Sequence, residues 1–271
     1  RPWCRANASK RPWRIIFCGC RPWDFPSSAW MEAASVASGR NRYYNKTMQM
    51  KYTTILFDFD GTLLESGPCI LSSMRATFKQ MGLTEIASRS DEALRPLVGP
   101  PLREGFGGIL KLPPERVEEA MELYRDISSA EAALALLRPY PGIPQMLKAL
   151  RARGAKTALA TAKRHDISLV HLRISGLTEL VDYVGAPHTD QACDKARLIA
   201  EAMETLEADP ARTVMVGDRL YDMEAAGRAG IPGVGVLYGY GSRAELAAHG
   251  ADHIVESVEQ LFDLLTEQED I

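Results

Sequence analysis

The stretch Tyr52-Thr-Thr-Ile-Leu-Phe57, followed directly by Asp58-Phe-Asp-Gly-Thr62, decides the fold of this chain. Its first half is a short run of β-branched and apolar residues, which predicts a buried strand. Two Asp beside a Gly are also typical of a simple turn. At the end of a buried strand, however, two close carboxylates need a cation or a proton to share. Because alternate residues of a strand point the same way, we expect Asp58 and Asp60 on one side.

Beyond this strand the sequence alternates between helix-like and strand-like patterns. Apolar stripes at helical spacing begin at Ile143, Ile199 and Val258. Short strand-like runs lie between them: Thr157-Ala-Leu-Ala160, Thr213-Val-Met-Val216 and Gly233-Val-Gly-Val-Leu237. This alternation predicts an α/β fold with a Rossmann-like, mainly parallel sheet. Such sheets bind ligands outside the carboxyl ends of their strands, so the candidate residues are sought there.

Residues 65–138, which we call the helical insert, interrupt this alternation. They contain helical stripes only, the first at Leu71/Met74/Phe78/Met81. Pro139-Tyr-Pro-Gly142 then ends the insert and restarts the core. A helical module placed directly after the first strand predicts a cap over the carboxyl end of that strand. The expected domains are therefore a core of residues 51–64 and 139–271 and a helical cap of residues 65–138.

Three further groups of polar residues stand at predicted strand ends or helix starts. Gly217-Asp218 ends one strand, and Asp222 lies one helical turn further on. Thr161 ends another strand and is expected to open the next helix, where a hydroxyl and free N–H groups bind anions. Lys195 stands in a first helical turn, against the helix dipole. Each also has a plain structural explanation, as an N-cap for Asp218 and Thr161 and as a solvated side chain for Lys195. Carboxylates without His or Cys partners suit Mg²⁺.

Taken together, these motifs resemble those of the haloacid dehalogenase-like (HAD) hydrolase superfamily. The motifs are Asp58-Phe-Asp-Gly-Thr62, Thr161, Lys195 and Gly217-Asp-Arg-Leu-Tyr-Asp222, which stand in the order and approximate spacing of that family. The resemblance runs from residue 52 to about residue 267. Tyr238-Gly-Tyr-Gly241 and the helical insert resemble the phosphoglycolate phosphatase-like branch, which carries its cap after the first motif.

The resemblance implies a Mg²⁺-dependent phosphatase that acts on small phosphate monoesters. Asp58 would be the nucleophile and form an aspartyl-phosphate. Asp60 would protonate the leaving oxygen and later activate water. Mg²⁺ would be held by Asp58, Asp218 and the backbone carbonyl of Asp60.

The remaining roles that the resemblance implies concern the phosphate and the substrate. The phosphate would be held by Thr161, the N–H of Ala162 and Lys195, with Asp222 in a supporting role. Lys163 is the alternative candidate for the phosphate-binding lysine. Arg103 follows the loop Leu97-Val-Gly-Pro-Pro-Leu102 in the helical insert and is a candidate for a substrate carboxylate or second phosphate, or an ordinary solvated side chain.

Two positions depart from the family pattern, and several functions stay open. Ala162 stands where relatives often have Asn or Ser, and Arg219 stands where Ser or Thr is common, which weakens the transfer of a specific substrate.

The first substrate candidate is 2-phosphoglycolate, followed by nucleoside 5′-monophosphates and pyrophosphate. A β-phosphoglucomutase-type mutase is an alternative, although Thr62 resembles the phosphatases. A dehalogenase would leave Asp60 without a role. A catalytically silent binding protein is the alternative outside enzymology.

The first fifty residues differ in composition from the rest of the chain. Residues 1–47 hold nine Lys or Arg against two acidic residues, and the triplet Arg-Pro-Trp recurs at positions 1, 11 and 21. We interpret residues 1–50 as an extension outside the folded protein, with Met48 or Met50 as the natural beginning. An organelle-targeting peptide and a basic-aromatic binding arm are the alternatives.

Composition also limits the partners and the compartment. The formal net charge of −3 and the lack of a long apolar run argue against a nucleic-acid or membrane partner, so we expect a small phosphorylated metabolite instead. Outside the extension only Cys69 and Cys193 remain, too few for a disulfide framework. A reducing, cytoplasmic location follows, for a monomer or a homodimer.

Overall fold

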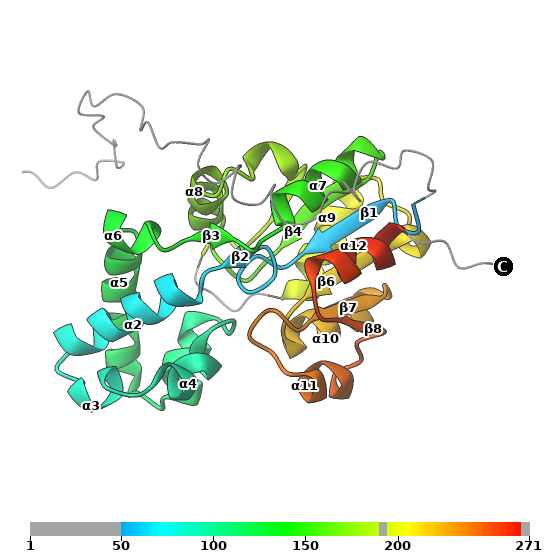
Figure 1. The fold of residues 1–271 in the computed structure, drawn as a ribbon. Helices are drawn as coiled ribbons and strands as arrows, with labels where there is room; N and C mark the ends of the chain where they lie inside the picture. Colours follow the sequence, from blue (N-terminus) through cyan, green and yellow to red (C-terminus); the bar gives the residue numbers. More distant parts are fainter. Residues whose placement is uncertain (1–49, 190–193, 267–271) are drawn as a thin grey trace, which may run out of the picture. The chain divides into compact units, whose positions relative to one another are not determined.

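The structure is a computed structural model that describes residues 50–189 and 194–266. Its centre is a parallel sheet with the strand order β5-β4-β1-β6-β7-β8 (Figure 1). The strands are, in chain order, β1 (Thr54–Phe57), β4 (Lys156–Ala160), β5 (Tyr183–Gly185), β6 (Thr213–Gly217), β7 (Gly233–Val236) and β8 (His253–Val255). The predicted α/β class with a mainly parallel sheet is confirmed. The edge strands β5 and β8 were not predicted, because each is only three residues long and lacks an apolar run.

Strand β1 lies at the centre of the sheet, and all four of its residues are buried. It pairs in parallel with β4 on one side and β6 on the other. Phe57, its last residue, is in register with Leu159 and with Val216. The carboxyl ends of these three strands therefore lie level with each other, and the residues that follow them converge at one edge of the sheet.

Helices cover both faces of the sheet. Successive residues of β1 point to opposite sides, and because all of them are apolar or buried, both sides must be covered. Ile55 and Phe57 belong to one apolar cluster, and Leu56 belongs to another. The first cluster includes residues of α7 (Ile143–Ala152), α8 (His165–Ile174) and α12 (Val258–Thr266), whereas the second includes residues of α9 (Lys195–Thr205) and α10 (Leu220–Ala229). Shorter elements complete the core: α11 (Arg243–Ala248), η4 (Thr178–Leu180) and η5 (Pro210–Arg212).

The helical insert leaves and rejoins the core through a two-stranded antiparallel ribbon. Its strands are β2 (Leu64–Glu65) and β3 (Arg138–Pro139), in which Leu64 pairs with Pro139. The helices between them are α2 (Gly67–Gln80), α3 (Thr84–Ala87), α4 (Asp91–Leu94), η2 (Arg95–Leu97), the π-helix η3 (Glu104–Ile109), α5 (Pro114–Ser128) and α6 (Glu131–Leu134).

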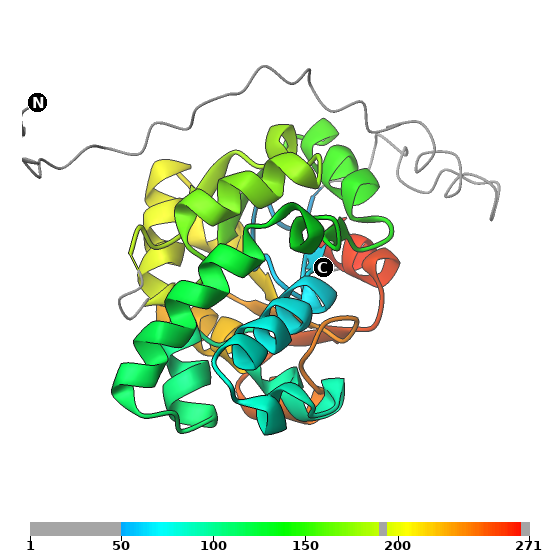
Figure 2. The same cartoon turned by 90° about the vertical axis from the view of Figure 1, so that its left-hand side faces the viewer.

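An apolar core of its own holds the helical insert together. Helix α2 packs against α5: the two cross in Figure 1 and run alongside each other in Figure 2. Phe78 of α2 meets Phe106 of η3 edge to face, with ring centroids 5.6 Å apart. Met74 and Met121 are buried in the same cluster. The insert is thus a packed helical module, separate in its core from the sheet.

Met50, the last residue of the expected extension, is buried in the sheet's apolar cluster, and its carbonyl accepts a hydrogen bond from Arg212. Residues 1–49 and Cys193 lie outside the described residues. Among the residues that are described, every helix is too short or too polar to cross a bilayer.

Candidate active site

The turn after β1 brings Asp58 and Asp60 to one cavity. The strand ends at Phe57, and the chain turns back through hydrogen bonds from Leu64 N–H to Phe59 and from Gly61 N–H to Leu64. Phe59 is buried in the core, whereas Asp58 and Asp60 on either side of it both line the cavity. The expected common side of the two carboxylates is therefore observed.

Gly61 is required in this turn for two reasons. Its φ is +86°, a left-handed conformation that favours glycine. A Cβ at this position would also lie 2.3 Å from Oδ2 of Asp218, which leaves no space for a side chain. The turn after β1 thus rests directly against the carboxylate that follows β6.

A lysine joins two of the buried carboxylates. Lys195, the first residue of α9, places its Nζ 3.0 Å from Oδ1 of Asp58 and 2.5 Å from Oδ1 of Asp222. The other oxygen of Asp222 accepts the backbone N–H of Arg219 at 3.0 Å, so both of its oxygens are engaged. Although burial acts to lower it, these two carboxylates raise the pKa of Lys195. Asp222 therefore supports Lys195 and the start of α10.

The third carboxylate, Asp218, is fully buried behind the turn after β1. Its Oδ2 accepts the backbone N–H of Tyr240 at 2.7 Å, and its Oδ1 lies 3.3 Å from the hydroxyl of Thr62. A Cβ on Gly239 would lie 2.4 Å from the Cβ of Asp218. Glycine on both sides, at positions 61 and 239, lets the backbone close around this side chain.

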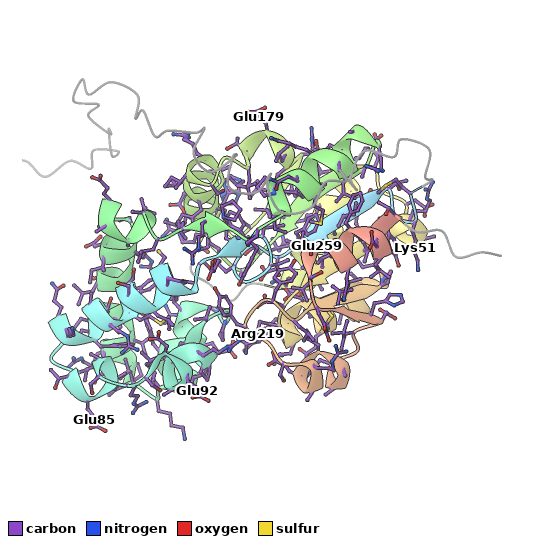
Figure 3. All side chains as sticks on the ribbon, viewed as in Figure 1. Lys51, Glu85, Glu92, Glu179, Arg219 and Glu259 are labelled. Atoms are coloured by element: carbon purple, nitrogen blue, oxygen red, sulfur yellow. The ribbon has the colours of Figure 1, made fainter. Side chains whose placement is uncertain are left out.

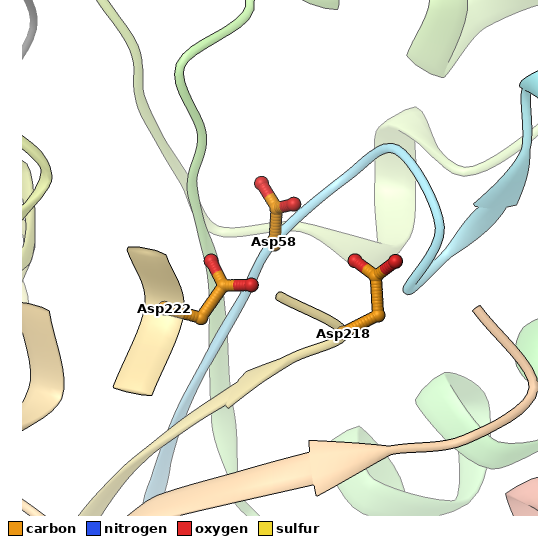
Figure 4. A group of neighbouring side chains, drawn as sticks. All are labelled: Asp58, Asp218 and Asp222. Carbon is orange, nitrogen blue, oxygen red and sulfur yellow. The ribbon is translucent and has the colours of Figure 1, made fainter. Parts of the chain in front are cut away.

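These three carboxylates form a candidate site for a divalent cation. Oxygen atoms of Asp58, Asp218 and Asp222 all lie within 4.8 Å of one another, and their side chains converge (Figure 4). Burial, helped by Asp222, raises the pKa of Asp58 to about 6 even though Lys195 opposes the shift. Burial, Asp222 and Asp58 likewise raise the pKa of Asp218 well above its ordinary value. Excess buried negative charge with oxygen donors alone fits a hard divalent cation.

A second lysine serves Asp60. Nζ of Lys163 lies 2.9 Å from Oδ2 of Asp60, and both side chains are only slightly exposed. Although burial acts to raise it, Lys163 holds the pKa of Asp60 below its ordinary value. The other oxygen, Oδ1, is buried and has no hydrogen-bond partner among the described residues. His171 lines the same cavity, and burial lowers its pKa to about 3, so its ring is neutral.

Thr161 lies at the predicted strand end, but it does not open a helix. Helix α8 begins at His165, after a turn in which the Thr161 hydroxyl accepts the N–H of Lys163 at 3.3 Å. The expectation of a helix start at Thr161 is therefore wrong. The physical reason is that Arg164 is extended, with ψ of 144°, and the N–H of His165 bonds to the carbonyl of Pro187. Thr161 and Ala162 both line the cavity.

The cavity lies between the sheet edge and the helical insert. Its volume is about 140 Å³, and apolar residues of the insert such as Ile70 and Met121 form its far wall. Arg103 lines it too, with a half-exposed guanidinium that is paired with Glu118. Lys163 lies on the cavity wall, whereas Lys195 lies beneath Asp58 and is not among the lining residues.

Comparison with known proteins identifies this arrangement. The family model described as haloacid dehalogenase-like hydrolase matches residues 55–236, which include all four motifs. This chain is a haloacid dehalogenase-like hydrolase. The resemblance found in the sequence is confirmed, and so is the expectation of a hydrolase.

Relatives and solved structures of this hydrolase cover nearly the whole described chain. It is 30% identical to pyrophosphatase PpaX of Halalkalibacterium halodurans over 217 residues, which are 80% of this chain and 98% of the relative. Pyrophosphatase PpaX of Anoxybacillus flavithermus is 31% identical, with 80% and 98% covered. A protein of Clostridium acetobutylicum, described as a predicted phosphatase, superposes with a TM-score of 0.74 at 31% identity, covering 80% of this chain and 99% of that structure.

The sequence analysis missed several residues of the hydrolase that touch the site. His171 and Tyr124 line the cavity, and Tyr240 holds Asp218 through its backbone. Tyr240 carries a usable signal, since it stands between two glycines just after β7. His171 carries none, because a histidine within an apolar helical stripe is usually structural.

Proposed function

We propose that this hydrolase is a Mg²⁺-dependent phosphatase of small phosphorylated metabolites, similar to phosphoglycolate phosphatases, with Asp58 as its nucleophile. One observation carries the proposal. Lys195 contacts Oδ1 of Asp58, whereas no donor among the described residues reaches Oδ2, and Asp58 lines the cavity. A buried carboxylate with one anchored oxygen and one open oxygen suits in-line attack on phosphorus.

The proposed reaction has two displacements. In the first, Oδ2 of Asp58 forms a bond to phosphorus, the bond to the leaving oxygen breaks, and Asp60 gives that oxygen its proton. In the second, Asp60 takes a proton from water, the water oxygen attacks the same phosphorus, and the bond to Asp58 breaks. Asp58 and Asp60 are then restored. A phosphate monoester yields an alcohol and inorganic phosphate, whereas pyrophosphate yields two molecules of inorganic phosphate.

Positive charge and hydrogen-bond donors surround the place where charge would develop. Bound at Asp58, Asp218 and the carbonyl of Asp60, Mg²⁺ would neutralise charge between the nucleophile and the phosphate. Lys195, which contacts Asp58 and does not line the cavity, would steady the nucleophile, and Lys163, the Thr161 hydroxyl and the Ala162 N–H would hold the phosphate oxygens. Asp222 would keep Lys195 in place.

The ionisation of Asp60 fits one half of this cycle directly. Lys163 favours the carboxylate form, which is the form that activates water. A bound phosphate would compete for Lys163, because the two anions share one ammonium group. Substrate binding would then weaken the hold of Lys163 on Asp60 and favour the protonated form that the first step needs.

The cavity favours a small substrate with a second anionic group. A volume of about 140 Å³ is close to that of an engineered cavity that holds benzene, about 150 Å³. Lys163, Arg103, Arg125 and Arg164 all contribute to its lining. Both 2-phosphoglycolate and pyrophosphate meet these conditions, and pyrophosphate is supported by the names of the PpaX relatives. A nucleoside monophosphate is larger and ranks after them.

The decisive experiment measures phosphate release from a panel of substrates with Mg²⁺ and with EDTA, for wild type and Asp58→Asn. The panel contains 2-phosphoglycolate, pyrophosphate, nucleoside monophosphates and β-glucose 1-phosphate. We expect Mg²⁺-dependent release that Asp58→Asn lacks, with the small dianionic compounds preferred. Conversion of β-glucose 1-phosphate to an isomer without phosphate release would favour a mutase. Folded wild-type protein that binds these compounds and turns over none would favour a silent binder.

Three further expectations concern the location, the oligomeric state and the helical insert. A reducing, cytoplasmic location agrees with Cys69, a buried thiol that lies in no disulfide. A monomer or homodimer remains our prediction, which light scattering of the purified chain tests. The helical insert would act as a cap, hinged near Leu64 and Pro139. Equal amide protection of the insert with and without a bound phosphate analogue would contradict that role.

A further inference from the structure

Tyr240 contacts three separate parts of the molecule through three different groups. Its backbone N–H donates to Oδ2 of Asp218 at 2.7 Å. Its hydroxyl accepts the N–H of Gly67 at 2.5 Å, and its carbonyl accepts Nε of Arg95 at 3.2 Å. Asp218 belongs to the candidate cation site, whereas Gly67 and Arg95 belong to the helical insert. Tyr240 thus joins a carboxylate of that site to the insert at two points.

The contact with Gly67 satisfies a need of the insert. Gly67 is the first residue of α2, and the first N–H groups of a helix have no partner within it. Ser66, the N-cap, makes no side-chain cap here. The hydroxyl of Tyr240 supplies an acceptor from the core in its place. A Cβ on Gly67 would lie 2.7 Å from that hydroxyl, so the two segments are in direct contact.

The loop that carries Tyr240 is also fixed tightly to the turn that carries Asp218. A Cβ on Gly239 would lie 2.4 Å from the carbonyl oxygen of Gly61, and one on Gly241 would lie 2.0 Å from the carbonyl oxygen of Asp218. The carbonyl of Gly239 accepts Nη2 of Arg95 at 3.0 Å. The loop is therefore in close contact with the turn of Asp218 on one side and hydrogen-bonded to Arg95 of the insert on the other.

Arg219 makes a second contact between the core and the helical insert. Arg219, labelled in Figure 3, follows Asp218 in sequence and donates from Nη1 to the carbonyl of Val98 at 2.5 Å, while its Nε pairs with Glu245. The insert thus docks on the residues on both sides of the cation site. Arg219 donates its backbone N–H to Asp222, whereas Tyr240 donates its backbone N–H to Asp218.

We infer that Tyr240 is a positioning residue that couples cation binding at Asp218 to docking of the helical insert on the core. The inference rests on the proposed Mg²⁺ site. A cation that fixes Asp218 also fixes the Tyr240 N–H, and with it the hydroxyl and carbonyl that hold α2 and Arg95. Because coupling is reciprocal, docking of the insert strengthens cation binding by the same factor.

The test uses Tyr240→Phe, which removes the hydroxyl but keeps the ring and the backbone N–H. Tyr238→Phe is the matched control, because the Tyr238 hydroxyl is buried two residues away with no hydrogen-bond partner among the described residues. Mg²⁺ affinity is measured by calorimetry, and amide exchange is followed in peptides covering residues 64–70, with and without Mg²⁺.

We expect Mg²⁺ to slow exchange in this segment of wild type and of Tyr238→Phe, but not of Tyr240→Phe. Mg²⁺ binding to Tyr240→Phe should be weaker by roughly 3- to 10-fold, the worth of one hydrogen bond. Gly67→Ala disturbs the same contact from the side of the insert and should also lose the Mg²⁺-dependent protection and weaken Mg²⁺ binding. It provides a second test if Tyr240→Phe folds poorly.

Two results would overturn the coupling while the proposed function stands. They are full Mg²⁺-dependent protection in Tyr240→Phe with unchanged affinity, and an equal loss in Tyr238→Phe, which would indicate ring packing instead. If wild type binds no Mg²⁺, the cation site fails and the coupling fails with it. Calorimetry on wild type therefore separates the two failures.

Discussion

Asp58 and Asp60 are separated by one residue, yet their surroundings oppose each other. Asp58 shares its site with two further buried carboxylates and one lysine, and burial, helped by Asp222 and Asp60, raises its pKa to about 6 against the opposing effect of Lys195. Asp60 has Lys163 to itself, and its pKa is lowered. One region carries excess negative charge, whereas the other is balanced.

This difference shows which region needs a cation. Three carboxylates and one ammonium group leave a net negative charge in a buried volume, and a bound cation would reverse the pKa shift of Asp58. Asp60 is already paired with the ammonium group of Lys163 and needs no metal ion. Pairs of carboxylates whose environments separate their pKa values commonly divide the roles of nucleophile and acid–base. The following predictions test that division, from the largest effect to the smallest.

The largest effect is expected from Asp58→Asn. An amide cannot form the aspartyl-phosphate, so turnover should fall by roughly 10⁴- to 10⁶-fold, as for nucleophiles elsewhere. Rapid-quench labelling with a ³²P-labelled substrate should detect phosphoprotein in wild type and none in the variant. Undiminished labelling of Asp58→Asn would place the nucleophile elsewhere.

Asp60→Asn should have a smaller effect that depends on the leaving group. Loss of a general acid–base costs about 10²- to 10⁴-fold with an alkyl phosphate. With p-nitrophenyl phosphate the leaving group departs without a proton, so the first step should slow much less. Burst kinetics on both substrates separate the steps. An equal loss with both substrates in the burst phase would contradict the acid role of Asp60.

The two lysines should differ in their effect on stability. Lys195→Met leaves Asp58 and Asp222 buried without their common partner, which typically costs about 3–5 kcal/mol. Lys163→Met leaves only Asp60, whose side chain is 15% exposed, so a cost of about 1–3 kcal/mol is expected. Urea unfolding in EDTA compares the pair. A larger loss for Lys163→Met would reverse the ranking of the two regions.

The smallest effect concerns pH in the absence of a cation. The pKa of Asp58 is about 6 in the folded protein and 3.8 in the unfolded chain, so the folded form binds the proton more tightly. This contribution to the free energy of unfolding is present below pH 4 and is lost as the pH rises through 6. In EDTA, the stability of wild type relative to Asp58→Asn should therefore fall between pH 4 and pH 7. Saturating Mg²⁺ should abolish this trend, and a trend of the opposite sign would refute the raised pKa.

The sequence predicts the framework of this site because its signals are local. An apolar strand that ends at Asp58, and another that ends at Gly217, must meet at one sheet edge once the sheet is parallel. Strands β1, β4, β6 and β7 and helices α2, α5, α7, α9 and α12 all carry clear periodicity. The edge strands β5 and β8 do not, because they are short and half-buried.

The partners of the charged side chains were beyond the reach of the sequence. Lys163 lies before α8 and Lys195 is the first residue of α9, so their pairing with Asp60 and Asp58 depends on how distant segments fold together. The predicted helix start at Thr161 is also wrong, because α8 begins at His165. Likewise, Tyr240 meets Gly67 across 173 positions of sequence, which no local pattern encodes.

The ribbon of β2 and β3 has a consequence for how such a protein can change over evolution. The chain leaves the core at Leu64 and returns at Pro139, and these two residues are paired neighbours. The entropy of closing a loop grows only slowly with its length. A helical module of another size could therefore replace the present one without rewiring the sheet, provided that it again meets Tyr240 and Arg219. The junction lets substrate preference diversify while the reaction chemistry is inherited intact.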